Sequence, residues 1–281
     1  MTSLPRTALL RDAVVLLLLV AMVSIAPAGA AEQSPLVFAG GGSGVPIVRL
    51  LAEAFVRTRP DVRIEVPASI GTGGGIRAAA EGAITVGLIA RPLRDNEKGL
   101  GLTTLTYART AVVIAAHPRV VDNDITAGAL VDVYRGKKTR WRDGQEIIVL
   151  TREPGDSIIE VLQERVPGFS EAYAESQRAR RWTTLYSAQQ MNEVLAKTPH
   201  AIGVSDMGVI TSEQWPIKVL NFNGVYPLPQ YVTTGRYPLV RILAFVFRRD
   251  GLPTGARAFI DFVRSKDGTR ILRASGYLPG E

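Results

Sequence analysis

The sequence of 281 residues contains no cysteine and only two histidines, His117 and His200. Without cysteine the chain has no disulfide framework, no thiolate metal site and no residue for lipid attachment. Each histidine adjoins a proline, and neither belongs to a cluster with metal-ligand spacing. We therefore expect no metal, no cofactor and no catalytic triad.

Motifs of nucleotide-binding and hydrolytic enzymes are also missing. The glycine stretches 40–46 and 71–76 lack the Gly-Lys-Ser/Thr of a Walker loop, and Val45 and Ile76 interrupt the dinucleotide pattern G-x-G-x-x-G. Val45 also stands where a nucleophile elbow, G-x-S-x-G, needs its last glycine. We predict that the chain is not an enzyme, and an exported phosphoester enzyme is the less favoured alternative.

The hydrophobic run near the start, Ala13–Ala26, has 14 residues and is short for a membrane span. Arg6 and Arg11 precede it, and the small residues Ala28-Gly29-Ala30 follow it. This order predicts a secretory signal peptide over residues 1–30. An uncleaved anchor is the alternative. We expect a periplasmic location.

The chain is basic, with 33 Lys+Arg against 26 Asp+Glu and a net charge of +7. Such a balance in an exported protein suggests small acidic ligands or an anionic surface, or it has no specific meaning. The cluster Arg178–Arg181 could indicate nucleic acid. No aromatic residues interleave it, so we interpret it as a solvated helix face and expect no nucleic-acid partner.

Short apolar runs alternate with amphipathic segments along the chain, which predicts an α/β protein with mostly parallel sheets. The predicted strands are 36–39, 62–66, 85–90, 108–117, 146–151, 201–205 and 242–247. The predicted helices are 46–58, 75–81, 127–134, 157–164, 187–196, 254–264 and 268–274. No internal repeat or low-complexity linker separates these elements.

Three strand-to-helix turns resemble one another: 38–46 and 69–76 are rich in glycine, and 151–159 carries Asp156 and Ser157 at the expected N-cap of its helix. A helix start leaves backbone N–H groups free and carries partial positive charge, and glycine lets a ligand approach the backbone. Together these features make a cradle for an anion. The third turn adds Arg152, which can hold an oxyanion by two hydrogen bonds. The alternative is that turns simply need glycine and that Ser157 caps a helix.

Several stretches resemble the PstS-like phosphate-binding proteins of bacterial ABC importers. They are "FAGGGSG", "SIGTGGGIRAAAEGAITVGLIARPLRDNE", "VYRGKKTRW", "TREPGDS", "YPLVR" and "FIDFVRSKDGTRILRASGYLP", in order over residues 36–281. The resemblance implies a type II periplasmic binding protein fold, with two α/β lobes and a ligand cleft that closes by a hinge motion. Lobe 1 would comprise 31–108 and 224–281, and lobe 2 would comprise 109–223, with crossings near Ala108 and Gly224.

The same resemblance implies a set of ligand-binding residues. They are Ser43, Gly44, Thr72, Gly73, Gly74, Arg152, Asp156 and Ser157. The sequence departs from the family where Gly73 replaces the usual serine, where Asp156, Ser157 and Ile158 replace a Ser-Gly-Thr run, and where Ala90 replaces the carboxylate that accepts the proton of hydrogen phosphate.

These departures leave the ligand open. We hypothesise that Asp156 replaces the missing acceptor; the alternative is that it pairs with Arg152 or caps the helix. Arg91 stands at a strand end facing the expected cleft, where a salt bridge is the alternative role. We predict a monomeric solute-binding protein that captures phosphate or a related oxyanion for the membrane subunits of an ABC importer. One alternative is a protein that presents its ligand to a membrane sensor. Another is an interaction module that has lost its ligand.

Overall fold

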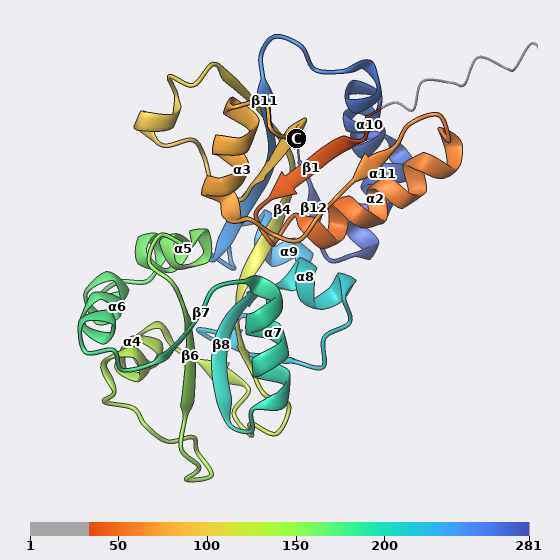
Figure 1. The fold of residues 1–281 in the computed structure, drawn as a ribbon. Coiled ribbons are helices and arrows are strands. Elements are labelled where there is room, and N and C mark those ends of the chain that lie inside the picture. Colours follow the sequence, from red (N-terminus) through yellow and green to blue (C-terminus); the bar gives the residue numbers. More distant parts are fainter. Residues whose placement is uncertain (1–33, 281) are drawn as a thin grey trace, which may run out of the picture. The chain divides into compact units, whose positions relative to one another are not determined.

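The computed structural model describes residues 34–280, shown as a coloured ribbon in Figure 1. The predicted signal peptide, residues 1–30, lies outside these residues. Within 34–280, every helix is too short or too polar to cross a membrane.

The described chain alternates strands and helices. The strands are β1 (Leu36–Gly40), β2 (Ile64–Glu65), β3 (Val86–Ile89), β4 (Leu102–Ala116), β5 (Asp124–Ile125), β6 (Ile148–Arg152), β7 (Thr183–Leu185), β8 (Ala201–Asp206), β9 (Lys218–Val219), β10 (Asn221–Phe222), β11 (Val240–Arg248) and β12 (Leu278–Pro279). The helices are α2 (Val45–Thr58), α3 (Gly71–Ala80), the 3₁₀ turn η1 (Asp95–Glu97), α4 (Ala127–Arg135), α5 (Ser157–Arg165), α6 (Phe169–Arg178), α7 (Ala188–Lys197), α8 (Met207–Ser212), α9 (Pro229–Thr233), α10 (Thr254–Arg264) and α11 (Lys266–Ala274).

The main sheet has the strand order β2-β1-β3-β11-β4-β8-β6-β7, and β9 and β12 also pair with β4. The pairings are parallel at both flanks, among β2, β1 and β3 and among β8, β6 and β7. They are antiparallel in the middle, where β11 pairs with β3 and β4, and β4 pairs with β8. The predicted α/β class is confirmed, and the antiparallel strands β4 and β11 make the sheet mixed.

Two large hydrophobic cores flank the middle of this sheet, and a third, smaller cluster of the described residues includes Ile76, Ile89 and Val246. The first core contains buried residues between Phe38 and Ala108 and between Leu243 and Tyr277. The second core contains buried residues between Ala111 and Leu239. Figure 1 shows β4 running between the helices of the two cores, α2, α10 and α11 on one side and α4 to α7 on the other. Each core therefore has its own helices, and β4 supplies residues to both.

The predicted division into 31–108 with 224–281 and 109–223 remains a prediction. The structure places Val232, Tyr237 and Leu239 in the second core, although the prediction assigned them to lobe 1. The change from one core to the other falls between Leu239 and Leu243. A boundary at Gly224 would thus cut through packed residues of the second core.

Helix α6 was not predicted, although its buried residues Phe169, Ala172, Tyr173 and Ser176 have helical spacing. The interpretation of Arg178–Arg181 as a helix face was wrong beyond Arg178, where α6 ends. Arg180 has a φ of 45°, which turns the chain out of the helix. The guanidinium of Arg181 then donates to the backbone carbonyl of Arg135, at the negative end of the α4 dipole.

Candidate functional site

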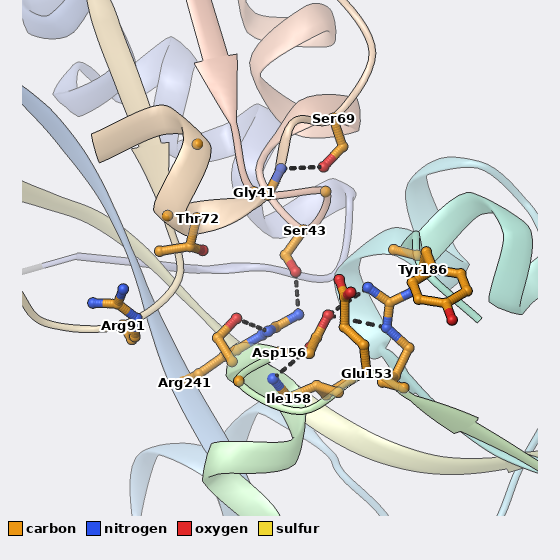
Figure 2. Close-up of a pocket in the computed structure, with 18 of the residues that line it drawn as sticks. Gly41, Ser43, Ser69, Thr72, Arg91, Glu153, Asp156, Ile158, Tyr186 and Arg241 are labelled. Atoms are coloured by element: carbon orange, nitrogen blue, oxygen red, sulfur yellow. Dashed lines mark hydrogen bonds and ion pairs between the residues drawn. The ribbon is translucent and has the colours of Figure 1, made fainter. Parts of the chain in front are cut away.

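A cavity of about 340 Å³ lies where the three predicted turns meet (Figure 2). Its lining comprises residues 41–43, 69–74, 91, 94, 152–158, 186, 188, 204–206 and 241. Seven of the eight predicted ligand-binding residues are among them; the exception is Gly44. Their roles as ligand contacts remain predictions, but residues far apart in the sequence do share one cavity.

Gly44 lies behind the cavity wall, at the N-cap of α2. A Cβ atom at this position would lie 2.7 Å from the hydroxyl oxygen of Tyr107, so the glycine makes room for that buried ring. The neighbouring Ser43 lines the cavity and is 3% exposed. Its hydroxyl donates a hydrogen bond of 2.7 Å to Asp206 Oδ2.

Helix α3 begins at Gly71, four residues before the predicted start at Gly75. Glycines disfavour helix interiors, which is why the sequence suggested a later start. Packing outweighs that preference, since a Cβ at Gly75 would lie 2.9 Å from the Cα of Gly40 in β1. Thr72 and Gly73 thus stand in the first helical turn, where backbone N–H groups have no acceptor within the helix. This end of α3 presents donors and partial positive charge to the cavity.

Arg152 and Asp156 form an ion pair at the third turn. Arg152 Nε donates a 3.0 Å hydrogen bond to Asp156 Oδ2, and Nη2 donates to the same oxygen. Asp156 Oδ1 accepts from the backbone N–H of Ile158 at 2.8 Å, so Asp156 also caps α5. Asp156 thus pairs with Arg152 and caps the helix, which was the alternative to its role as a proton acceptor. Arg152 Nη1 is buried and, within residues 34–280, has no hydrogen-bond partner.

Arg241 is a cavity residue that the sequence interpretation did not identify as a site residue. It projects from β11 between the two cores and faces Ser43 in Figure 2. Its Nε donates to Asp206 Oδ1 at 2.8 Å, its Nη1 donates to Ser157 Oγ at 2.8 Å, and its Nη2 donates to Ser43 and Asp206. One guanidinium therefore joins the first turn, the third turn and the end of β8.

Arg91 lines the cavity at 9% exposure, as its place at the end of β3 suggested. It also makes the salt bridge considered as the alternative: Nη1 and Nη2 donate to Glu97 at 2.7 and 2.8 Å. Glu160 of α5 lies 3.7 Å from Arg91 Nε and pairs with Arg94. This cluster links the segment after β3 to α5. The hydrogen bonds from Arg91 and from the backbone of Arg94 outweigh burial and lower the pKa of Glu97.

Ala90, at the position of the family's carboxylate, is buried and does not line the cavity. Its backbone N–H donates to Thr72 Oγ1 at 3.3 Å. Its methyl group cannot accept a proton from a ligand. Among the cavity-lining carboxylates, Asp156 and Asp206 are engaged by arginines.

An α/β chain with two cores, whose helix starts and arginines surround a cavity between them, has the architecture of a solute-binding protein. A family model described as "PBP superfamily domain" matches residues 26–267. The chain belongs to this superfamily, which confirms the family resemblance found in the sequence.

Three known proteins illustrate what this chain is similar to in sequence or in structure. The phosphate-binding protein PstS of Bacillus subtilis is 27% identical over 252 residues, which cover 87% of this chain and 80% of PstS. A crystal structure of a putative phosphate ABC transporter substrate-binding protein with bound phosphate, from Clostridium perfringens, has a TM-score of 0.78 and 25% identity, and covers 88% of this chain and 100% of that one. The structure of the reduced OxyR regulatory domain from Pseudomonas aeruginosa is 14% identical with a TM-score of 0.54. The match covers 82% of this chain and 97% of that one, and it shows only that the two share a fold.

Proposed function

We propose that this chain binds phosphate or a related small oxyanion in the cavity. The observation that carries the proposal is Arg152 Nη1, a buried donor with no partner within residues 34–280. The residue Arg152 lines the cavity together with the first turn of α3. A buried cationic donor left unsatisfied is costly, and an oxyanion satisfies it. Gly73, Gly74 and Ser157 would contribute backbone N–H groups, and Thr72 would contribute its hydroxyl.

The biological role that we propose is capture of this ligand for an ABC importer outside the cytoplasm. The names of the Bacillus and Clostridium proteins support this role. The signal peptide predicted over residues 1–30 supports export. We further propose that the protein acts as a monomer, because closing the cavity needs both cores free to move. We also propose that it needs no metal and no cofactor.

We also propose that the chain binds without catalysing a reaction. Neither His117 nor His200 lines the cavity. The hydroxyl of Ser157 accepts from Arg241, and the hydroxyl of Ser43 accepts from Arg241 and donates to Asp206, a carboxylate that is itself paired with Arg241. A serine hydroxyl that accepts from a guanidinium is fixed in place in the cavity lining and is poorly activated as a nucleophile, even where it also donates to a carboxylate.

Thermal unfolding of the mature protein against an anion panel tests the proposal. The protein is first unfolded, washed and refolded to remove bound ligand. A ligand at 100 times its Kd should stabilise the fold by about 2.7 kcal/mol, which raises Tm by roughly 5 °C. A shift with phosphate or its monoesters, absent with chloride, supports the proposal. An unchanged Tm with every oxyanion overturns it.

A further inference from the structure

The cavity has more room than an inorganic oxyanion needs. Phosphate has five heavy atoms, whereas about 340 Å³ corresponds to roughly eleven water molecules at about 30 Å³ each. Pockets of about 300 Å³ and above commonly hold small organic molecules. An oxyanion between Arg152 and α3 would leave part of the cavity unfilled.

Two apolar side chains of the lining are unusually exposed. Ile70, just before α3, is 49% exposed, and Tyr186, between β7 and α7, is 66% exposed. An inorganic ion offers these side chains nothing to pack against. An organic group attached to the oxyanion would cover them, and removal of apolar surface from water favours binding.

Glu153 indicates which chemical group the organic part of the ligand must carry. It lines the cavity and is half-buried, and its side-chain carboxylate has no hydrogen-bond or ion-pair partner among the described residues. Figure 2 shows its side chain among those that line the cavity, where Asp156 and Tyr186 are also labelled. An ionised carboxylate only accepts hydrogen bonds and repels an anion. The part of the ligand near Glu153 must therefore carry a donor, either an ammonium or a hydroxyl.

We propose that the ligand is a small phosphate monoester or phosphonate whose organic part carries an ammonium or hydroxyl group. This inference rests on the proposed function and names its substrate class. The phosphoryl end lies at Arg152 and the first turn of α3. The organic part lies against Tyr186 and Ile70, with its donor on Glu153.

Isothermal titration of the stripped protein tests the inference with three probes: inorganic phosphate, methyl phosphate and phosphoethanolamine. The expected result is that phosphoethanolamine binds at least tenfold more tightly than either of the others, since a hydrogen bond between charged groups contributes about 1.5–3 kcal/mol and each tenfold is about 1.4 kcal/mol. Methyl phosphate is the matched ester that lacks a donor.

Two variants locate the effect. Glu153→Gln should reduce the preference for phosphoethanolamine over phosphate about tenfold, and Tyr186→Ala should reduce it several-fold. The matched controls are Glu146→Gln and Tyr226→Ala, an exposed glutamate and a 37% exposed tyrosine outside the cavity. Both controls should keep the wild-type ratio. Thermal unfolding without ligand checks that each variant folds.

The outcomes separate the two proposals. If phosphate binds as tightly as phosphoethanolamine and the variants leave the ratio unchanged, the inference is wrong while the proposed function stands. If phosphoethanolamine is preferred but Glu153→Gln keeps that preference, the assignment of Glu153 is overturned. If none of the three probes binds, the proposed function fails, and this inference fails with it.

Discussion

Arg241 and Asp206 form an ion pair whose side chains are only 5% and 1% exposed. Burial lowers the pKa of the Arg241 guanidinium, but the charge and hydrogen bonds of Asp206 raise it more, so that the pKa lies above its ordinary value. The pair ties β11 to the end of β8 where the first and second cores meet. It holds Ser43 and Ser157 in place by the same guanidinium.

We predict that Asp206→Ala lowers the free energy of unfolding by about 3–5 kcal/mol, because it leaves the Arg241 charge buried without its partner. Urea denaturation measures this loss. The matched control is Glu193→Ala, which removes the exposed pair of Glu193 with Lys197 and should lower the free energy of unfolding far less. Equal losses in the two variants would contradict the prediction.

The second prediction concerns the charge of Asp156. Asparagine is also a good N-cap, so Asp156→Asn should keep α5 capped while removing the carboxylate that neutralises Arg152. We expect a phosphate Kd several-fold lower than that of the wild type, measured by isothermal titration, because the anion then meets an uncompensated guanidinium. A weaker affinity would instead favour the hypothesis that Asp156 accepts a proton from the ligand.

Two glycines of α3 should respond in opposite ways to the same substitution. A Cβ at Gly73 meets no atom within 4 Å, so Gly73→Ala should raise the free energy of unfolding by about 0.5–1 kcal/mol through helix propensity. Gly75→Ala brings its Cβ within 3.0 Å of Ala39 O and should lower that free energy by about 1–3 kcal/mol. Paired urea denaturation curves decide the matter. A stable Gly75→Ala protein would mean that α3 shifts easily on β1.

The fourth prediction is a pH dependence. The pKa of Glu97 is lower in the folded chain than the ordinary 4.5, mainly through hydrogen bonds from Arg91. Its contribution to stability is therefore fully present above about pH 4.5 and is lost as the pH falls through the folded pKa. Glu97→Gln should cost about 1–2 kcal/mol at pH 7 and progressively less below pH 4.5, measured by denaturation across pH 3–7. Exposed Glu164→Gln serves as the control. A cost that stays constant down to pH 3 would contradict the linkage.

The cavity could be predicted from the sequence because its first components are local. Glycine turns, a strand-end arginine and a helix cap are each visible within a few residues, and the α/β pattern brings strand ends to one place. Arg241 and Asp206 could not be found in this way. Asp206 ends the buried strand β8 and Arg241 stands near the start of β11, and their only sequence signal is a charge where burial is expected. Their partnership spans 35 residues and arises from the pairing of β4 with both β8 and β11.

Element boundaries were less predictable. The strand β4 begins at Leu102, six residues before its predicted start. The threonines of 102–106 are polar, which hid the strand from a search for apolar runs, but they are β-branched and therefore favour a strand. Helix α10 was predicted with its observed bounds, Thr254–Arg264, because its apolar positions are strictly periodic. Packing decided the remaining ends, as at α3.

The strand β4 pairs with β11 and β12 along one stretch and with β8 and β9 along the next. Alternate residues of a strand face opposite sides, so a single-residue insertion near Thr110 would reverse the orientation of every residue on one side of it relative to the other. The spacing between the two stretches of β4 therefore fixes the strand register of both halves at once. A chimera that exchanges half of this protein with a relative can succeed only if it preserves the spacing along this strand.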